Sequence, residues 1–430
     1  MDSPITSHQA KSGQRRTRFP NRRALNHDSA HASAEDYSKN SPLPQIILTP
    51  PDLSALLDRL RQTGSFAYDS EFIGELTYLP QLCLIQVATV SEVALIDPLA
   101  GLDVTPFWDL VADASVEKIV HAGDQDVEPV FRHAQKPPAN IFDTQIAAGF
   151  VGLPYPLALA KLVQDLTGAR LGKSLTFTHW DQRPLSNHQL RYAADDVRYL
   201  PAVGAELRRR LEQNGHGAWA AEECRQLSVR GVYQFDPEKS YLRIRGANAL
   251  SPLGLAILRQ LSIWRDAAAQ TEDVPPRTLL KDEVMVDLAR SPVKQVDRLA
   301  KVRGLPRPVE EKYGQAIVDA TATALSLPPA EFPQPRSYEP SPRERYLADA
   351  LWAAGQTWCF GNGLDPNLLS SRQEIGDLCR CVERGEPTDN LPLLCGWRKE
   401  ALGDKLLQLL KGHFRFGVSW QDGLRTVEQK

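Results

Sequence analysis

The spacing of apolar residues changes along the chain, and each change marks a different kind of structure. From residue 45 onward, short runs rich in apolar residues alternate with amphipathic stretches, which predicts an α/β domain. The expected strands cover residues 66–71, 81–89, 93–96 and 118–121. The first three lie close enough along the chain to pair antiparallel, whereas the later ones are separated by helical segments such as 124–133 and are expected to join by crossovers. The pattern therefore predicts a mixed sheet.

After residue 187 the apolar period becomes helical. Residues 187–213 read as one long helix, which Pro201 kinks or splits into two. An amphipathic run follows at 253–268, and shorter helical runs continue to about residue 325. Prolines then crowd a short interval and mark a stiff linker, before a last helical block that runs from residue 343 to about 411. The chain beyond the α/β domain is therefore expected to be helical.

These changes divide the chain into parts with different expected structures. They are a disordered basic tail (1–43), an α/β domain (44–214), a connector (215–246), a helical domain (247–325), a proline-rich linker (326–342), a second helical domain (343–415) and a tail (416–430). A length of 430 residues agrees with such a division into several domains.

Composition narrows the class of protein. The chain is 42% hydrophobic and 24% charged, close to the globular average. The longest apolar stretch, 143–161, is interrupted by Pro154 and Pro156, and a membrane span needs about 20 consecutive apolar residues. The N-terminus lacks the apolar core of a secretory signal, and six irregularly spaced cysteines are typical of a reducing compartment. We therefore expect a cytoplasmic protein without a membrane partner.

The formal net charge of −3 conceals an uneven distribution. Residues 1–43 carry seven basic and four acidic side chains (+3), residues 44–214 carry 14 and 21 (−7), and residues 241–312 carry 13 and 9 (+4). The basic tail is interpretable as a solvated segment, as a nucleic-acid-binding arm or as an organelle-targeting peptide. The basic helical domain is either a platform for nucleic acid, because lysine and arginine displace counterions from phosphates, or a purely structural bundle.

Paired carboxylates are the first candidate for chemistry. Asp69 and Glu71 stand two residues apart in an expected strand, so their side chains point to the same face. Two neighbouring negative charges repel each other unless a cation lies between them, which favours a divalent metal site. A solvent-exposed strand face is the alternative explanation for this pair.

Two further elements carry acidic residues. A strand ends at His121, which is expected to stabilise that end, and the chain passes through glycine into a helix with Asp126 in its first turn, a position where the helix dipole also favours an acidic residue. Tyr192 and Asp196 are four residues apart and share one helix face. A half-buried hydrogen bond is the simpler explanation for that pair taken alone.

Together, Asp-x-Glu, His-x4-Asp and Tyr-x3-Asp resemble the three exonuclease motifs of the DEDD superfamily, tyrosine subclass. The segments LPQLCLIQ (79–86), DTQ (143–145) and WDQRPL (180–185) are similar to the ribonuclease D family more narrowly, and this resemblance covers residues 45–214. Residues 247–325 resemble a helicase-and-RNase-D C-terminal (HRDC) domain, and residues 343–415 resemble a more divergent second copy.

The resemblance implies an α/β fold of the RNase H-like (DnaQ-like) type, with a mixed five-stranded sheet, followed by two small all-α HRDC-type domains. It implies a 3′–5′ exoribonuclease that trims tRNA precursors and other structured RNAs and releases nucleoside 5′-monophosphates. Two Mg²⁺ or Mn²⁺ ions would be held by all-oxygen ligands, one activating the attacking water and the other stabilising the leaving 3′-oxygen. The implied ligands are Asp69, Glu71, Asp126 and Asp196.

Three other residues receive roles at this stage. Tyr192 is expected to orient the attacking water, because a phenol with an unperturbed pKa of about 10 is a poor general base. Lys173 is expected either to contact a phosphate of the substrate or to be a solvated loop lysine, and Gln86 is expected to contact the substrate. Protein partners are not indicated by the sequence.

Two alternative functions stay open. A 3′–5′ exodeoxyribonuclease uses the same carboxylate set, although the chain contains no polymerase or helicase region. A catalytically inactive RNA-binding adaptor would require the loss of a metal ligand, whereas all four carboxylates and Tyr192 are present.

Overall fold

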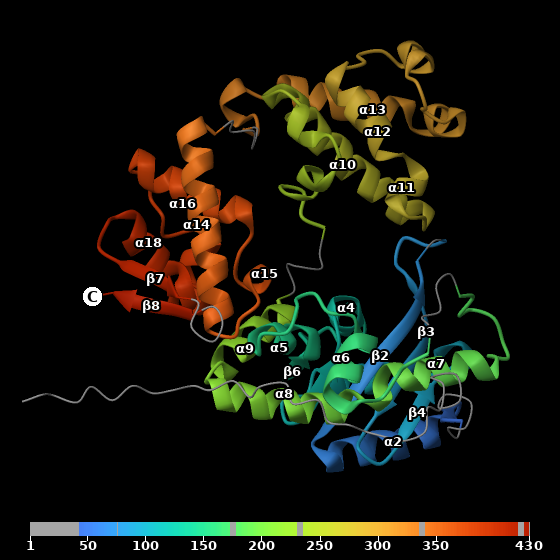
Figure 1. Cartoon of the computed structure of the whole chain (residues 1–430). Coiled ribbons are helices and arrows are strands. Elements are labelled where there is room, and N and C mark those ends of the chain that lie inside the picture. Colours follow the sequence, from blue (N-terminus) through green and yellow to red (C-terminus); the bar gives the residue numbers. More distant parts are fainter. Residues whose placement is uncertain are drawn as a thin grey trace, which may run out of the picture.

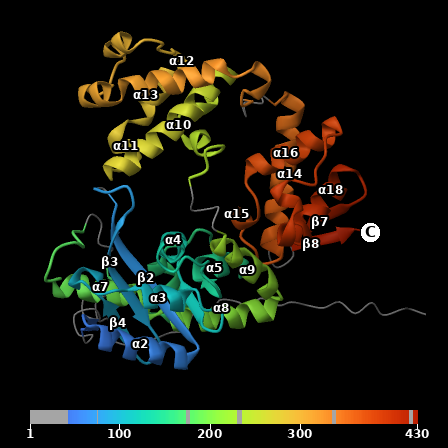
Figure 2. The same cartoon turned by 180° about the vertical axis from the view of Figure 1, so that it is seen from behind.

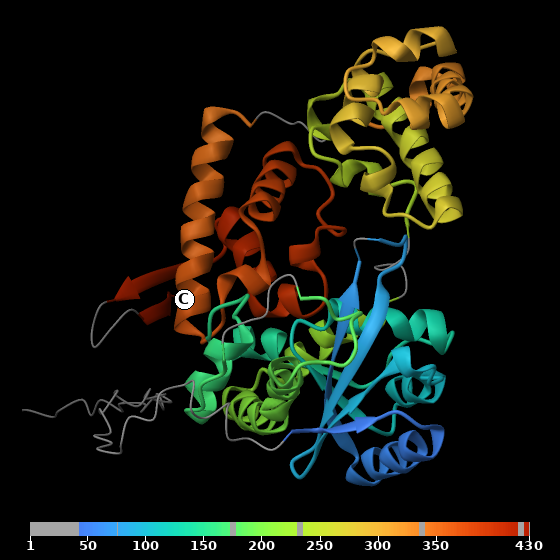
Figure 3. The same ribbon diagram turned by 90° about the vertical axis from the view of Figure 1, so that its right-hand side faces the viewer.

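The computed structural model describes residues 43–74, 76–172, 178–229, 235–334, 340–419 and 425–429. Figure 1 shows three parts: an α/β domain, a helical domain above it that contains α10 to α13, and a second helical region at its side that contains α14 to α18. The same arrangement is seen from behind in Figure 2 and from the side in Figure 3. Except for its last residue, the predicted basic tail lies outside the described residues.

A mixed sheet forms the centre of the α/β domain, as the apolar pattern predicts. Its strands follow the order β1-β4-β3-β2-β5-β6. β2 pairs antiparallel with β3, and β3 with β4, while β5 joins β2 and β6 joins β5 in parallel. The strands are β1 (Gln45–Ile47), β2 (Ser65–Ile73), β3 (Gln81–Ala88), β4 (Val93–Ile96), β5 (Glu117–Val120) and β6 (Ile141–Asp143).

The expected number of five strands was wrong by one. β1 pairs in parallel with β4 and adds a sixth strand at the edge, where the Asp97 backbone N–H also donates to the Ile47 carbonyl (3.1 Å). This strand has only three residues, too few for a recognisable alternation of apolar and polar positions.

Helices cover both faces of the sheet. Phe66 and Tyr68 point into one apolar core with α2 and α3, whereas Ala67 packs on the opposite face against Val197 and Leu200 of α7 and α8. The helices of this domain are α2 (Pro50–Thr63), α3 (Thr105–Val111), α4 (Asp124–His133), α5 (Thr144–Phe150), α6 (Leu159–Thr167), α7 (Asn187–Arg198), α8 (Leu200–Asn214) and α9 (Gly217–Cys224).

The long helix expected over residues 187–213 is two helices. α7 ends at Arg198 and α8 begins at Leu200, because Pro201 has no N–H to donate and fits only the first turn of a new helix. Of the two outcomes left open for Pro201, the split is the one observed.

The first helical domain has an apolar core of its own. Buried residues of α10, α12 and α13 form one cluster that contains no residue of the α/β domain. Its helices are α10 (Pro252–Glu272), α11 (Pro276–Leu279), α12 (Asp282–Arg290) and α13 (Arg307–Ser326). Inside the domain, Arg265 is buried and pairs with Asp282 (2.8 Å).

The second helical region consists of α14 (Pro342–Gly361), α15 (Pro366–Leu369), α16 (Arg372–Arg384), α17 (Gly396–Arg398) and α18 (Asp404–Leu410). The described residues of the segment expected as a tail (416–430) belong to strands. Strands β7 (Arg415–Ser419) and β8 (Arg425–Gln429) pair antiparallel there.

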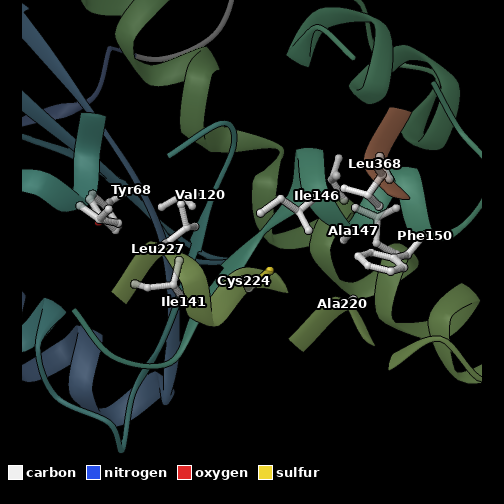
Figure 4. Packing of buried hydrophobic residues seen from close by; sticks show 14 of the residues in the cluster. Tyr68, Val120, Ile141, Ile146, Ala147, Phe150, Ala220, Cys224, Leu227 and Leu368 are labelled. Carbon is white, nitrogen blue, oxygen red and sulfur yellow. The ribbon is translucent and has the colours of Figure 1, made fainter. Parts of the chain in front are cut away.

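This second region shares one apolar core with the α/β domain. Leu368 of α15 and Trp397 of α17 belong to the same buried cluster as Ala147 and Phe150 of α5. Figure 4 shows Leu368 beside Ala147 and Phe150, with Ala220 of α9 below them. The rings of Phe150 and Trp397 meet edge to face, 4.7 Å apart. The two parts therefore fold as one packed unit.

A close backbone approach tightens this junction. Gly152 has φ +77°, and a Cβ at this position would lie 3.2 Å from the Gly363 carbonyl oxygen. Only glycine combines that backbone conformation with so little space. Across the described residues, no helix is both long enough and apolar enough to span a membrane.

Candidate active site

Strand β2 presents Asp69 and Glu71 on the face that α7 covers. Alternation along the strand turns Tyr68 into the opposite core and leaves the two carboxylates on the α7 side. The pairing of β2 with β3 shifts register between Glu71 and Phe72. Such bulges bend a strand and redirect its side chains beside active sites.

Helix α7 supplies the other half of the site. It begins with a capping box between Ser186 and Gln189, and the fully buried Ala193 packs it closely on the sheet. One ligand oxygen from each of Asp69, Glu71 and Asp196 lies within 4.8 Å of the other two. The strand and the helix therefore bring three predicted ligands together.

Asp126 lies next to this group, in the first turn of α4. Its side chain is buried and accepts a hydrogen bond from the Ser70 hydroxyl. The charge of Asp69 acts on its carboxyl group as well. The fourth predicted ligand thus lies beside the group of three, joined to β2 through Ser70.

A strained turn orients Asp126. Ala122, just before α4, has φ 56°, in the left-handed region that few non-glycine residues adopt. The Asp143 carboxylate accepts the backbone N–H groups of Ala122 (3.2 Å) and Gly123 (2.9 Å) and also those of Gln145 and Ile146. His121 holds the strand end as expected, through Thr144 Oγ1 and the Leu157 carbonyl, both at 3.0 Å.

Contacts with the Trp180 segment hold Tyr192 in place. Its ring lies 6.2 Å from that of Trp180, and Arg183 holds the Trp180 segment by donating to the Trp180 carbonyl (2.7 Å). Arg183 also forms a two-pronged ion pair with Asp97, at 2.6 and 2.7 Å. Sequence reasoning did not single out Ser70 or Asp97, because neither contact is local in the chain.

Gln86 and Lys173 are the two residues expected to contact the substrate. Gln86 is fully buried and donates from Nε2 to Glu71 Oε1 (3.4 Å). It therefore orients a carboxylate, and its expected contact with substrate stays a prediction. Lys173 lies outside the described residues.

The carboxylates raise each other's pKa. Burial, and then the charges of Asp69, Asp196 and Asp126, raise the pKa of Glu71 to about 9. Burial and Asp69 raise the pKa of Asp196 to about 8 and hold that of Asp126 well above its usual range. Burial raises the pKa of Asp69 to about 6, against hydrogen bonds that lower it. The protein alone cannot hold four negative charges in this space at neutral pH.

A divalent cation would remove this conflict. Several carboxylate oxygens and no nitrogen or sulfur form the donor set, which suits Mg²⁺ or Mn²⁺ rather than a softer metal. Burial, followed by the negative charges of Asp196 and Glu71, raises the pKa of Tyr192. Its phenol therefore stays protonated and serves as a hydrogen-bond donor.

A mixed α/β sheet that carries acidic residues on β2, α4 and α7, with a tyrosine beside them, defines a nuclease of the 3′–5′ exonuclease class. A family model described as "3'-5' exonuclease" matches residues 44–212, and one described as "HRDC domain" matches residues 254–321.

Known relatives place the chain more narrowly. It is 37% identical to ribonuclease D of Gluconacetobacter diazotrophicus over 391 residues, 90% of this chain and 96% of that protein. It is also 37% identical to ribonuclease D of Zymomonas mobilis, over 85% and 94% of the two chains. The structure of Escherichia coli RNase D, described as an exoribonuclease involved in structured RNA processing, matches with a TM-score of 0.75 and 32% identity, covering 86% of this chain and 99% of that one. The chain belongs to the ribonuclease D family of 3′–5′ exoribonucleases.

Proposed function

We propose that this exoribonuclease trims the 3′ ends of tRNA precursors and other structured RNAs in the cytoplasm, and that two Mg²⁺ or Mn²⁺ ions bind its carboxylates. The observation that carries the metal site is the cluster of Asp69, Glu71 and Asp196 within 4.8 Å, with Asp126 close enough for the charge of Asp69 to act on it. The involvement of the E. coli relative in structured RNA processing supports this substrate class. The six cysteines are free thiols, in keeping with a reducing compartment.

The reaction is hydrolysis of the last phosphodiester bond. The oxygen of a water forms a bond to phosphorus, the bond from phosphorus to the 3′-oxygen of the preceding nucleotide breaks, and that oxygen takes up a proton. A nucleoside 5′-monophosphate leaves. When bound, divalent ions neutralise the carboxylates, activate the water and stabilise charge on the leaving oxygen.

The side chains have separate tasks in this scheme. Asp69, Glu71, Asp126 and Asp196 supply the ligand oxygens, and Gln86 fixes the orientation of Glu71. Tyr192, whose phenol has an unperturbed pKa of about 10, donates a hydrogen bond that orients the water.

Replacing one ligand tests this assignment. In the Asp196→Asn variant a negative ligand becomes a neutral amide of the same shape, and we expect trimming to fall by about 100-fold or more, the scale of losing one electrostatic stabiliser. RNA binding should persist. The measurement is the digestion of 5′-labelled and 3′-labelled RNA with Mg²⁺, with Mn²⁺ and with chelator, alongside DNA of the same sequence.

A neighbouring residue provides the matched control. Asp195 stands on the same helix but pairs with Arg198 (3.2 Å), so Asp195→Asn should retain most of the activity. Full activity of Asp196→Asn, or of the wild-type protein in chelator, would overturn the metal assignment. A precursor tRNA with a short 3′ trailer, compared with an unstructured RNA of equal length, tests the substrate class.

A further inference from the structure

The hairpin formed by β2 and β3 carries the active site on one strand and two exposed leucines at its tip. Asp69 and Glu71 lie on β2, while Leu76 and Leu79 follow in the turn and keep 68% and 44% of their surfaces exposed. A single exposed apolar residue is ordinary on a protein surface. Two exposed leucines at the tip of the hairpin that carries the catalytic carboxylates indicate a contact surface.

The tip is fixed to the HRDC domain. The Tyr78 hydroxyl donates to Asp266 Oδ1 (2.8 Å) and accepts from Gln270 Nε2 (2.9 Å). The Tyr78 backbone N–H donates to Asp273 Oδ1 (3.1 Å). These three bonds, which we call the Tyr78 latch, join the tip to α10. Figures 1 and 3 show the hairpin rising from the sheet to meet this domain.

The turn itself is also stabilised. The Thr77 hydroxyl donates to the Leu79 carbonyl (2.6 Å). The two leucines therefore stand on a supported turn, with their positions set by bonds on both sides of Tyr78.

The distance from the carboxylates to the tip is short. Leu76 stands five positions after Glu71, so their Cα atoms lie at most about 17 Å apart. An RNA whose 3′ end reaches the carboxylates therefore passes within a few nucleotides of the tip if it continues toward the HRDC domain.

The HRDC domain carries exposed basic side chains in and after α11, while the groups bonded to the tip are the acidic Asp266 and Asp273 and the amide of Gln270. Helix α11 follows α10 in the HRDC domain and lies toward the hairpin in Figures 1 and 2, while the bonds to the tip come from the end of α10. Helix α11 contains Arg277, whose side chain is 76% exposed and pairs with Asp282 (2.9 Å), and the exposed Lys281 follows it. Proteins bind single-stranded nucleic acid by combining cations for the phosphates with apolar or aromatic groups for the bases, and leucine is among the side chains that they insert between bases.

We propose that Leu76 and Leu79 form a wedge that contacts RNA bases a few nucleotides upstream of the scissile bond and separates the end of a stem from the 3′ strand. The wedge rests on the proposed exoribonuclease function and sets how close to a stem the enzyme trims.

The test compares three substrates in the full-length protein. They are a dinucleotide, a single-stranded oligonucleotide, and the same oligonucleotide as a 3′ overhang on a stem. In the Leu76→Ser, Leu79→Ser double variant we expect an unchanged dinucleotide rate, a rise in KM of about 5-fold for the single strand, the scale of one lost base contact, and trimming that stops farther from the stem. Thermal melting verifies folding.

Val90→Ser is the matched control. Val90 is 90% exposed but lies in the turn between β3 and β4, at the other end of β3. Equal losses on all three substrates, no loss at all, or the same stalling in Val90→Ser would each overturn the wedge. Failure of the wild-type protein to shorten any of the RNAs would instead overturn the proposed function, and with it the wedge.

Discussion

The two helical regions are attached to the catalytic domain by opposite means. The C-terminal region shares an apolar core with it, through Trp397 and Leu368, and the Glu223 carboxylate accepts two bonds from Arg398 (2.7 and 2.8 Å). The HRDC domain keeps its apolar residues in a separate core and meets the hairpin tip through the three hydrogen bonds of the Tyr78 latch.

This difference makes the C-terminal region a rigid extension of the catalytic domain and the HRDC domain a module that can move relative to it. Burial of apolar surface contributes about 25 cal/mol per Å² and is lost only when the parts unfold or separate completely. A net hydrogen bond contributes only about 1 kcal/mol, because water replaces it when the contact opens. We therefore expect the C-terminal region to unfold with the catalytic domain, and the HRDC domain to unfold and move independently.

The largest effect is expected from Trp397→Ala. The side chain is 2% exposed, and its Nε1 donates to Glu223 Oε2 (2.6 Å), so its removal should cost about 3–5 kcal/mol. Hydrogen exchange followed by mass spectrometry should show faster exchange in α5 and α9 of the catalytic domain, and unchanged exchange in α10.

The control for this prediction is a cavity in the other core. Met285 is fully buried in the HRDC domain, and Met285→Ala should speed exchange in α10 and α12 but not in α5. If both variants loosened the whole chain equally, the two attachments would not differ in kind.

Local spacing predicted which of the candidate residues share a face, and the resemblance to the ribonuclease D family assigned them to one site. Asp69 and Glu71 share a face because a strand has a period of two, and Tyr192 shares one with Asp196 because they are one helical turn apart. The antiparallel pairing of β2, β3 and β4 followed from their closeness along the chain. The burial of Lys118 in β5 could not be predicted from local spacing. Its ammonium group donates to two nearby backbone carbonyls, and these bonds allow the side chain to be fully buried.

Contacts between domains could not be predicted. Tyr78 and Asp266 are 188 residues apart, and Arg398 lies 175 residues from Glu223. Hydrophobic periodicity shows which face of an element is buried but not which partner covers it. The same limit applies to Gln86, whose burial depends on α7 packing over β3.

A smaller effect, on motion rather than on stability, is expected from Tyr78→Phe. The variant keeps the ring and the backbone bond to Asp273 but loses both hydroxyl bonds of the latch. Fluorophores on α8 and α13 should report a broader distribution of distances, while the melting temperature stays nearly constant. Tyr346→Phe, at an exposed tyrosine of α14, is the control and should change neither. An unchanged distribution in Tyr78→Phe would mean that something other than the latch holds the HRDC domain.

The smallest expected effect is on the pH dependence of stability, and it is confined to the apolar junction between the catalytic domain and the C-terminal region. Burial lowers the pKa of His216, which stacks on Trp219 (4.8 Å) and shares a hydrogen bond between Nδ1 and the Phe150 carbonyl (2.8 Å). Since the unfolded chain binds this proton first, near pH 6.5, the contribution of His216 is present above that pH and is lost as pH falls through the lower folded pKa. Urea unfolding from pH 7.5 to 5 should therefore show a smaller pH dependence in His216→Asn than in the wild-type protein. The HRDC domain, residues 247–325, contains no histidine, so its transition should respond equally in both proteins. An equal pH dependence of the catalytic transition in both proteins would remove His216 from the coupling between the two parts.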